Sequence, residues 1–152
     1  INCWILRQGI GGDIIVDFDK AISFEGVCGP DLQYSSVLAN SLLKKAKERY
    51  NVAKTVFATN TRVPSGWTTS NLERFLERFP SVVAKAGKEF APHHIVTYLI
   101  DLASEFNSFY ANHKIIDETD PTSSYRLALT SAFAEVMTSG LNLLGIKVPK
   151  VM

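Results

Sequence analysis

The 152-residue sequence contains few cysteines, no long apolar run and almost no net charge. Its two cysteines, Cys3 and Cys28, lack the spacing of metal ligands and cannot form a framework of several disulfides, and no secretory signal is evident, so a cytoplasmic location is expected. No run approaches the roughly 18 apolar residues of a membrane span, which predicts a soluble protein without membrane contact. Lys and Arg number 16 against 15 Asp and Glu, so overall charge gives no argument for nucleic-acid binding, and any such contact must be local.

The sequence also lacks the usual signatures of a self-sufficient enzyme. The segment "QGIGGD" has neither the lysine nor the hydroxyl of a phosphate-binding loop, and we expect a turn there. His93 and His94 are adjacent and cannot share one helix face as the histidines of a zinc site do, so no metal site is expected. No Gly-x-Ser-x-Gly motif occurs, and Asp17 and Asp19 fit solvated charges beside a strand better than an acid/base pair. No catalytic residue is therefore assigned.

The first part of the chain predicts a short strand followed by a long helix. Residues 13–19, "DIIVDFD", are rich in β-branched residues and are typical of a strand. In residues 30–50, Tyr34, Leu38 and Leu42 recur four apart, and the cations of "LLKKAKERY" favour the C-terminal end of a helix. Residues 2–7 are too short to assign.

Residues 51–69 have no clear period and predict a loop, after which helical spacing returns. Ser70 and Glu73 form a capping-box pattern that begins the next helix. Pro80 is expected to end it, leaving a short amphipathic piece at 81–90.

Two further helices complete the predicted bundle. One starts with Pro92 in its first turn, and its apolar stripe consists of Ile95, Leu99, Leu102, Phe106 and Phe109. The other starts with Asp120 as N-cap and Pro121 in the first turn, is expected to end near Gly140, and has the stripe Tyr125, Leu129, Phe133 and Val136. The apolar tail that follows is expected to pack on the bundle. The predicted fold is all-α, a bundle of four or five helices after a short N-terminal strand or linker.

One pair on the strongest helix suggests a binding function. Asn107 and Tyr110 are one turn apart on a flank beside the core stripe. An unstacked RNA base offers a face to an aromatic ring and an edge to an amide, so this pair fits single-stranded RNA. The structural alternative is that Tyr110 is a partly buried packing residue with its hydroxyl at the surface.

Three segments, in the same order, resemble the C-terminal part of arginyl-tRNA synthetase. "DIIVDFDKAISFEGVCGPDLQY" is similar to that family's strand-to-helix junction, and "FAPHHIVTYLIDLASEFNSFYANHKII" is similar to its "APH…YLYELA…FNxFY" helix. "YRLALTSAFAEVMTSGLNLLGIKVPKVM" resembles the family's last segment, "RLALxxAxxxVLxxGLxLLGIxxPExM". The resemblance covers nearly the whole chain except residues 51–70.

The resemblance implies a helical anticodon-binding domain at residues 23–152, preceded at residues 1–22 by a linker or the end of a catalytic domain. It further implies that this catalytic domain lies upstream in the same chain, where arginine is joined to tRNA with ATP and Mg²⁺. The 152 residues themselves would then hold no cofactor and no catalytic centre. The expected partners are that upstream domain and the anticodon arm of arginine tRNA, and the expected state is a monomer.

The resemblance also nominates RNA-binding residues, each with a structural alternative. Tyr34 could equally belong to the core, Gln33 and Asn107 could cap or bridge helices, and Arg126 could pair with Asp120 or Glu135. Because a thioether at a chain end is adaptable apolar surface, the C-terminal Met is expected to contact RNA. The full set is Gln33, Tyr34, Asn107, Tyr110, Arg126, Lys150 and Met152.

Two positions depart from the family pattern. Asp31 stands where the family usually has a tyrosine, and Leu38 where it usually has an arginine, so RNA contact is expected to depend more on the Asn107/Tyr110 helix and the tail. Leu38 is expected to be buried. The same departures favour an alternative function, a helical protein-interaction module or a diverged paralogue without RNA recognition.

Overall fold

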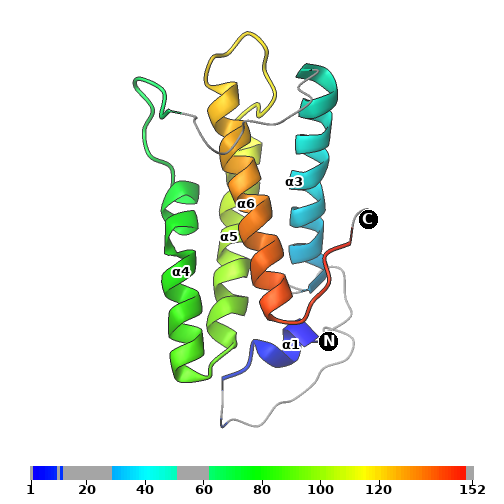
Figure 1. Cartoon of the computed structure of the whole chain (residues 1–152), viewed down its shortest axis with the longest axis vertical. Coiled ribbons are helices and arrows are strands. Elements are labelled where there is room, and N and C mark those ends of the chain that lie inside the picture. The colour runs from blue at the N-terminus through cyan, green and yellow to red at the C-terminus, as the bar shows by residue number, and fades with distance from the viewer. Residues whose placement is uncertain (1, 10, 12–28, 51–61, 150–152) are drawn as a thin grey trace.

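The computed structural model describes residues 2–9, 11, 29–50 and 62–149, and these residues form helices and no strand. The predicted all-α fold is therefore confirmed. The helices are α1 (Asn2–Leu6), α3 (Gly29–Tyr50), α4 (Asn71–Glu89), α5 (His93–Asn112) and α6 (Ser123–Leu143). Four long helices run side by side, with α3 and α4 at opposite edges and α5 and α6 between them, and α1 crosses beneath one end (Figure 1).

Several predictions concern residues outside the described part of the chain. The strand at 13–19, most of the loop at 51–69, and the tail residues Lys150 and Met152 belong to this group. Within the described ranges, no helix is both long and apolar enough to cross a membrane. Residues 2–7, which the sequence left unassigned, contain the short helix α1, whose Cys3 is buried in the same core as the long helices.

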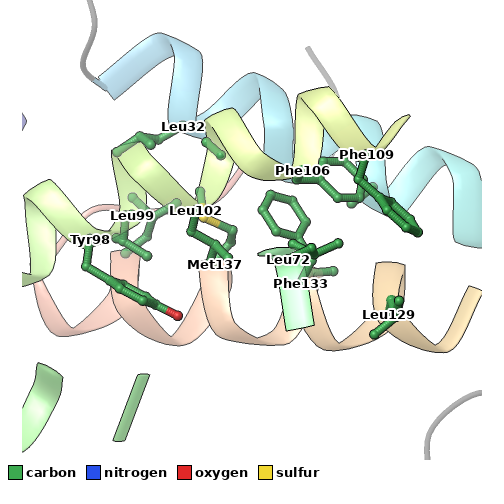
Figure 2. Packing of buried hydrophobic residues seen from close by; sticks show 14 of the residues in the cluster. Leu32, Leu72, Tyr98, Leu99, Leu102, Phe106, Phe109, Leu129, Phe133 and Met137 are labelled. Atoms are coloured by element: carbon green, nitrogen blue, oxygen red, sulfur yellow. The ribbon is translucent and has the colours of Figure 1, made fainter. Parts of the chain in front are cut away.

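The core is built around the apolar stripe of α5. All five predicted residues of that stripe are buried, and Leu99, Leu102 and Phe106 are fully enclosed. The rings of Phe106 and Phe133 stack with centroids 3.9 Å apart, and Met137 of α6 lies beside Leu102 (Figure 2). Each such buried side chain contributes roughly 1.5–3 kcal/mol through loss of apolar surface from water.

The predicted end of α6 near Gly140 is wrong, because the helix continues to Leu143. Gly140 is buried inside the helix, where an added Cβ would lie 2.7 Å from Cδ2 of Leu99. The glycine therefore serves close packing of α6 on α5. The chain turns instead at Gly145, whose φ is +69°, and the N–H of Ile146 donates to the carbonyl of Leu141 over 2.9 Å.

The predicted end of the preceding helix at Pro80 is also wrong, since α4 runs through it. Proline has no N–H, so one intrahelical bond is missing there and the helix propensity is low. One continuous apolar face nevertheless packs against the bundle on both sides of Pro80, and this packing outweighs the local preference. That face consists of Leu72, Phe75, Leu76, Phe79, Val82 and Ala86. The helix ends at Phe90, which has a left-handed φ of 53°.

The capping box at the start of α4 is confirmed. The Glu73 carboxylate accepts hydrogen bonds from the Ser70 N–H at 2.7 Å and from Nε1 of Trp67 at 3.0 Å. The Tyr125 hydroxyl of α6 also donates to Glu73 over 2.6 Å. Burial raises the pKa of Glu73, but these hydrogen bonds outweigh burial and hold the pKa below its ordinary value. The carboxylate thus joins the start of α4 to α6.

The predicted start of α6 is slightly misplaced. The N-cap is Thr122 and the first helical residue is Ser123, whereas Asp120 was expected to be the N-cap. Asp120 still accepts a hydrogen bond from the Thr122 N–H over 2.8 Å, so it caps the turn that leads into the helix. Pro92 was expected in the first turn of α5 but is its N-cap, directly before the first helical residue, and its carbonyl accepts from the Ile95 N–H.

The buried face of α3 differs from the predicted one. Tyr34 has 58% of its surface exposed, Leu38 is half-buried against the core and Leu42 is buried. The buried residues step instead by three and four along another stripe, which includes small residues that let α3 approach α6 closely. This stripe consists of Leu32, Ser35, Ser36, Ala39, Leu42 and Ala46. Tyr34 therefore projects from the bundle and Leu38 does not.

Candidate nucleic-acid interface

A cleft of about 370 Å³ lies between the start of α3 and the middle of α5. Tyr34 of α3 and Asn107 of α5, both nominated from the sequence, line it together. Asp31 and Asp101 contribute carboxylates from the two helices, and the buried Ser35 contributes a hydroxyl. No lysine or arginine is found among its described lining residues. We call this the acidic cleft.

A second hollow of about 540 Å³ lies further along the same pair of helices, at the C-terminal end of α5. Tyr110, with 41% of its surface exposed, lines it together with Leu42 of α3. His113 and Lys114 provide the polar groups, so we call it the Tyr110 cleft. Because Asn107 and Tyr110 are one helical turn apart, the two clefts follow each other along the α3–α5 seam. The structure thus places an exposed aromatic ring in each cleft.

Gln33 has a structural partner at the other end of the chain. Its Nε2 donates to the carbonyl of Lys147 over 2.8 Å, which joins the start of α3 to the C-terminal tail. The tail also packs as predicted, since Leu144 is buried and Ile146 and Val148 are partly buried against the core. Gln33 therefore bridges α3 and the tail in this structure.

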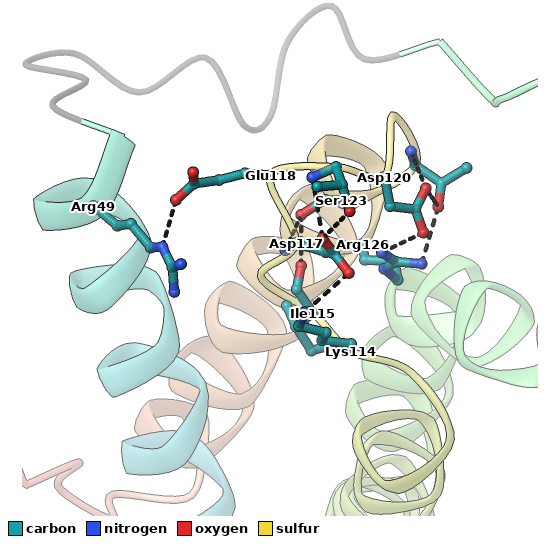
Figure 3. A network of polar contacts seen from close by, with 10 residues as sticks. Arg49, Lys114, Ile115, Asp117, Glu118, Asp120, Ser123 and Arg126 are labelled. Atoms are coloured by element: carbon teal, nitrogen blue, oxygen red, sulfur yellow. Dashed lines mark hydrogen bonds and ion pairs between the residues drawn. The ribbon is translucent and has the colours of Figure 1, made fainter.

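Arg126 lies buried, with 8% of its side chain exposed. Figure 3 shows its polar contacts. Its Nη2 is 2.8 Å from Oδ2 of Asp120, and its Nη1 donates to the Thr122 hydroxyl over 2.9 Å. Hydrogen bonds from Thr122, and then the Arg126 guanidinium, hold the pKa of Asp120 below its ordinary value. This geometry matches the ion-pair alternative, and it gives Arg126 the role of holding the start of α6.

The loop at 113–122 is tied down by further polar contacts (Figure 3). The Asp117 carboxylate accepts from the hydroxyl and N–H of Thr119 and pairs with Lys114 over 3.1 Å, and these contacts lower the pKa of Asp117 to about 2. Arg49 at the end of α3 pairs with Glu118 of the loop. The loop that continues the wall of the Tyr110 cleft thus contacts α3 through the Arg49–Glu118 pair.

Sequence reasoning missed part of this interface. Ser104 and Asp101 line the acidic cleft together with Asn107, one and two turns earlier on α5, and stepping back from Asn107 by three residues at a time would have found them. Asp31 was noticed only as a departure from a pattern. Its place beside Tyr34 and opposite Asp101 depends on how α3 packs on α5, which no local pattern reveals.

An all-helical bundle with exposed tyrosines and an amide along one seam fits the class of nucleic-acid-binding helical domains. Residues 32–152 match the model of the DALR anticodon binding domain, and the chain belongs to that family.

The relatives are aminoacyl-tRNA ligases. The chain is 37% identical over 136 residues to the arginine-tRNA ligase of Lactobacillus johnsonii, covering 90% of this chain and 23% of that protein. It is 36% identical over 140 residues to the arginine-tRNA ligase of Alkaliphilus metalliredigens, covering 92% and 24%. The arginyl-tRNA synthetase of Thermus thermophilus superimposes with a TM-score of 0.76 at 28% identity, over 99% of this chain and 26% of that structure. The chain thus spans about a quarter of the length of these relatives.

Proposed function

We propose that this chain binds the anticodon arm of an arginine tRNA, as the anticodon-binding domain of an arginine-tRNA ligase. The observation that carries the proposal is the α3–α5 seam, where Tyr34 and Tyr110 expose aromatic rings beside clefts that also present Asn107. Membership of the DALR family and the names of the relatives supply the ligand class.

The chemistry of the seam suits bases that have left the helical stack. The rings of Tyr34 and Tyr110 offer faces for stacking, and Asn107 offers both a donor and an acceptor for a base edge. The carboxylates of Asp31 and Asp101 accept hydrogen bonds, so the acidic cleft suits a base edge that carries an amino group. Base stacking on an aromatic side chain contributes roughly 1–3 kcal/mol per base.

The remaining nominated residues have different parts in this proposal. Gln33 and Arg126 position the tail and the start of α6, through their contacts with Lys147 and Asp120. Lys150 and Met152 lie outside the described residues, and we keep them as proposed RNA contacts from the tail.

The reaction of the whole enzyme belongs to the proposal as well. We assign arginine activation, with its ATP and Mg²⁺, to a catalytic region outside the part of the relatives that this chain matches. Within the described ranges, no group of three or more His, Cys, Asp or Glu side chains that could hold a metal ion comes together. We also propose that the whole enzyme is a monomer and acts in the cytoplasm.

The test is a low-salt titration of the chain with arginine tRNA and with a tRNA for another amino acid. We expect weak binding that decreases with salt, because contacts with phosphates release counterions. We also expect a preference for arginine tRNA, because contacts with bases distinguish one sequence from another. Asn107→Ala combined with Tyr110→Ala should weaken arginine-tRNA binding about tenfold or more, since about 1.4 kcal/mol corresponds to a factor of ten.

Thr97→Ala provides the matched control, because Thr97 is an exposed residue of α5 that lines neither cleft. Its binding should equal that of the wild type. Equal binding of both tRNAs, or an Asn107/Tyr110 variant that is folded by circular dichroism and binds normally, would contradict the proposal and favour a protein-interaction module.

A further inference from the structure

The exposed face of α4 carries a row of cations that none of the roles above uses. Arg74, Arg78, Lys85 and Lys88 are all exposed, and they follow one another at spacings of four, seven and three residues. At 3.6 residues per turn, these spacings place the four side chains within roughly 40° of a common line along the helix. The row is about 21 Å long at a rise of about 1.5 Å per residue. We call it the α4 basic row.

The row faces away from the bundle. The buried residues of α4, such as Leu72 and Ala86, lie on the opposite side of the helix. α4 itself packs on α5 and α6 at the edge of the molecule opposite α3 (Figure 1). The basic row and the two clefts of the α3–α5 seam are therefore separate surfaces.

Few of the neighbouring acids neutralise this row. Within the described part of the chain, none of its four cations forms an ion pair, and Arg78 instead lies over the Phe75 ring at 5.4 Å. Glu89 pairs with His94, and Glu73 is held by the hydrogen bonds of the capping box. Glu77 is the remaining carboxylate of α4, so the face keeps an excess of positive charge. The chain as a whole has a net charge of only +1, so this positive charge is a local property of the face.

An exposed aromatic residue follows the end of the row. Phe90 ends α4 in a left-handed conformation, and 83% of its surface is exposed. An exposed aromatic ring at the end of the helix that carries a line of cations is a combination that suits polynucleotides, because cations contact phosphates and a ring can stack on a base. An acidic polypeptide would use the cations but has no base to place on the ring.

We propose that the α4 basic row binds the phosphate backbone of RNA, on a surface separate from the clefts that contact bases. This inference rests on the proposed function only in taking RNA as the polyanion. The row contacts phosphates without reading sequence, so it adds affinity and orientation while the α3–α5 seam selects the RNA. A bound RNA then touches the domain at two edges.

The test compares the salt dependence of RNA binding between variants of the chain. Arg74→Gln, Lys85→Gln and Lys88→Gln are combined, and Arg78 is kept because it covers Phe75. The probes are arginine tRNA and an RNA hairpin of unrelated sequence, titrated between about 50 and about 200 mM salt. Each lost phosphate contact lowers the slope of log K against log salt by about 0.7–0.9, so the triple variant should lose about two to three units of slope with both probes.

The matched control removes three cations from an exposed part of another helix, by Lys44→Gln, Lys45→Gln and Lys47→Gln in α3. A smaller change of slope in this control is expected. An equal change in the two variants would overturn the proposal, because net charge would then explain the effect. An unchanged slope in a folded α4 variant would overturn it as well.

Two further measurements separate this proposal from the proposed function. Asn107→Ala with Tyr110→Ala should weaken binding of arginine tRNA and leave the unrelated hairpin unaffected, whereas the α4 variant should weaken both. If poly-glutamate binds the row more tightly than the hairpin does, and loses binding in the α4 variant, the RNA assignment is wrong while base contact at the seam still stands.

Discussion

Gly140 of α6 packs closely on Leu99 of α5. A Cβ at position 140 would lie 2.7 Å from one methyl carbon of Leu99 and 3.0 Å from the other, and Leu99 is fully enclosed. Overpacking of this kind costs about 1–3 kcal/mol, and the higher helix propensity of alanine recovers up to about 1 kcal/mol. With the full recovery, Gly140→Ala should lower the free energy of unfolding by up to about 2 kcal/mol, measured by urea denaturation.

Gly87 supplies the matched control for this substitution. It lies in α4, is exposed, and an added Cβ would meet nothing within 4 Å. Gly87→Ala should raise the free energy of unfolding by about 0.5–1 kcal/mol, because alanine loses less backbone entropy in a helix. A stabilised Gly140→Ala protein would show that Leu99 has room to move.

Single-residue roles were the least predictable part of the site. The exposure of Tyr34 could not be inferred, because Tyr34, Leu38 and Leu42 share a helical spacing while the packing of α3 on α6 selects another stripe. The sequence could not decide whether Arg126 contacts RNA or forms an ion pair. Its partner Asp120 lies in a loop, and the path of that loop depends on how α6 packs. Asn107 and Tyr110 were found correctly on a flank, because the strong stripe of α5 fixes what lies beside it.

At the scale of the helices, α4 shows how packing can overrule a local signal. Pro80 is exposed, leaves the Leu76 carbonyl without its usual donor, and still lies inside the helix. Pro80→Ala restores the missing N–H and removes an unfavourable residue. We expect the free energy of unfolding to rise by about 1–3 kcal/mol, measured by urea denaturation.

The opposite result would also be informative. If Pro80→Ala destabilises the protein, a bend at this proline is required for Phe79 and Val82 to reach the core. Ser81→Ala, which removes a hydrogen bond from the Ser81 hydroxyl to the Arg78 carbonyl, is the control for local change beside the proline. It should change stability much less.

The helix end predicted at Pro80 also concealed the α4 basic row. With a helix end assigned at Pro80, Arg74 and Arg78 fall on one element and Lys85 and Lys88 on another, and no row is evident. Once α4 is continuous, the spacings of four, seven and three align them. An error in one helix boundary therefore concealed a charge pattern that was present in the sequence.

At the scale of the whole molecule, three lowered carboxylate pKa values predict acid sensitivity. The pKa of Glu73 lies below its ordinary 4.5, that of Asp117 is about 2 and that of Asp120 lies below 3.8. A depressed folded-state pKa gives stability that is present above the unfolded value and is lost as pH falls through the folded value. The urea concentration at which half of the protein is unfolded should therefore decrease as the pH is lowered from 4.5 to 2.

The contribution of these carboxylates can be separated from general acid effects. Glu73→Gln should be less stable at neutral pH and should lose less on acidification, because it has no carboxylate to protonate. Glu135→Gln, at an exposed position of α6, should follow the wild-type pH profile. Identical profiles of stability against pH for Glu73→Gln and the wild type would contradict the role given to the Glu73 carboxylate.

The fold as a whole was largely predictable, because helices that each carry one apolar stripe can bury these stripes only by packing against one another. The stripe from Ile95 to Phe109 and the capping box of Ser70 and Glu73 are local patterns that packing reinforces. The sequence wrongly predicted helix ends at Pro80 and near Gly140. Both residues lie inside their helices because of packing on a neighbouring helix, which no local pattern reveals.

The central place of α6 has a consequence for how the protein is made. Phe133, Met137 and Leu141 are fully enclosed and contact helices that precede them in the chain. A ribosome releases α3, α4 and α5 before α6, so Leu99 and Phe106 emerge before the residues that cover them. Until α6 has emerged, the part of the core that it covers therefore remains an exposed apolar surface on the nascent chain.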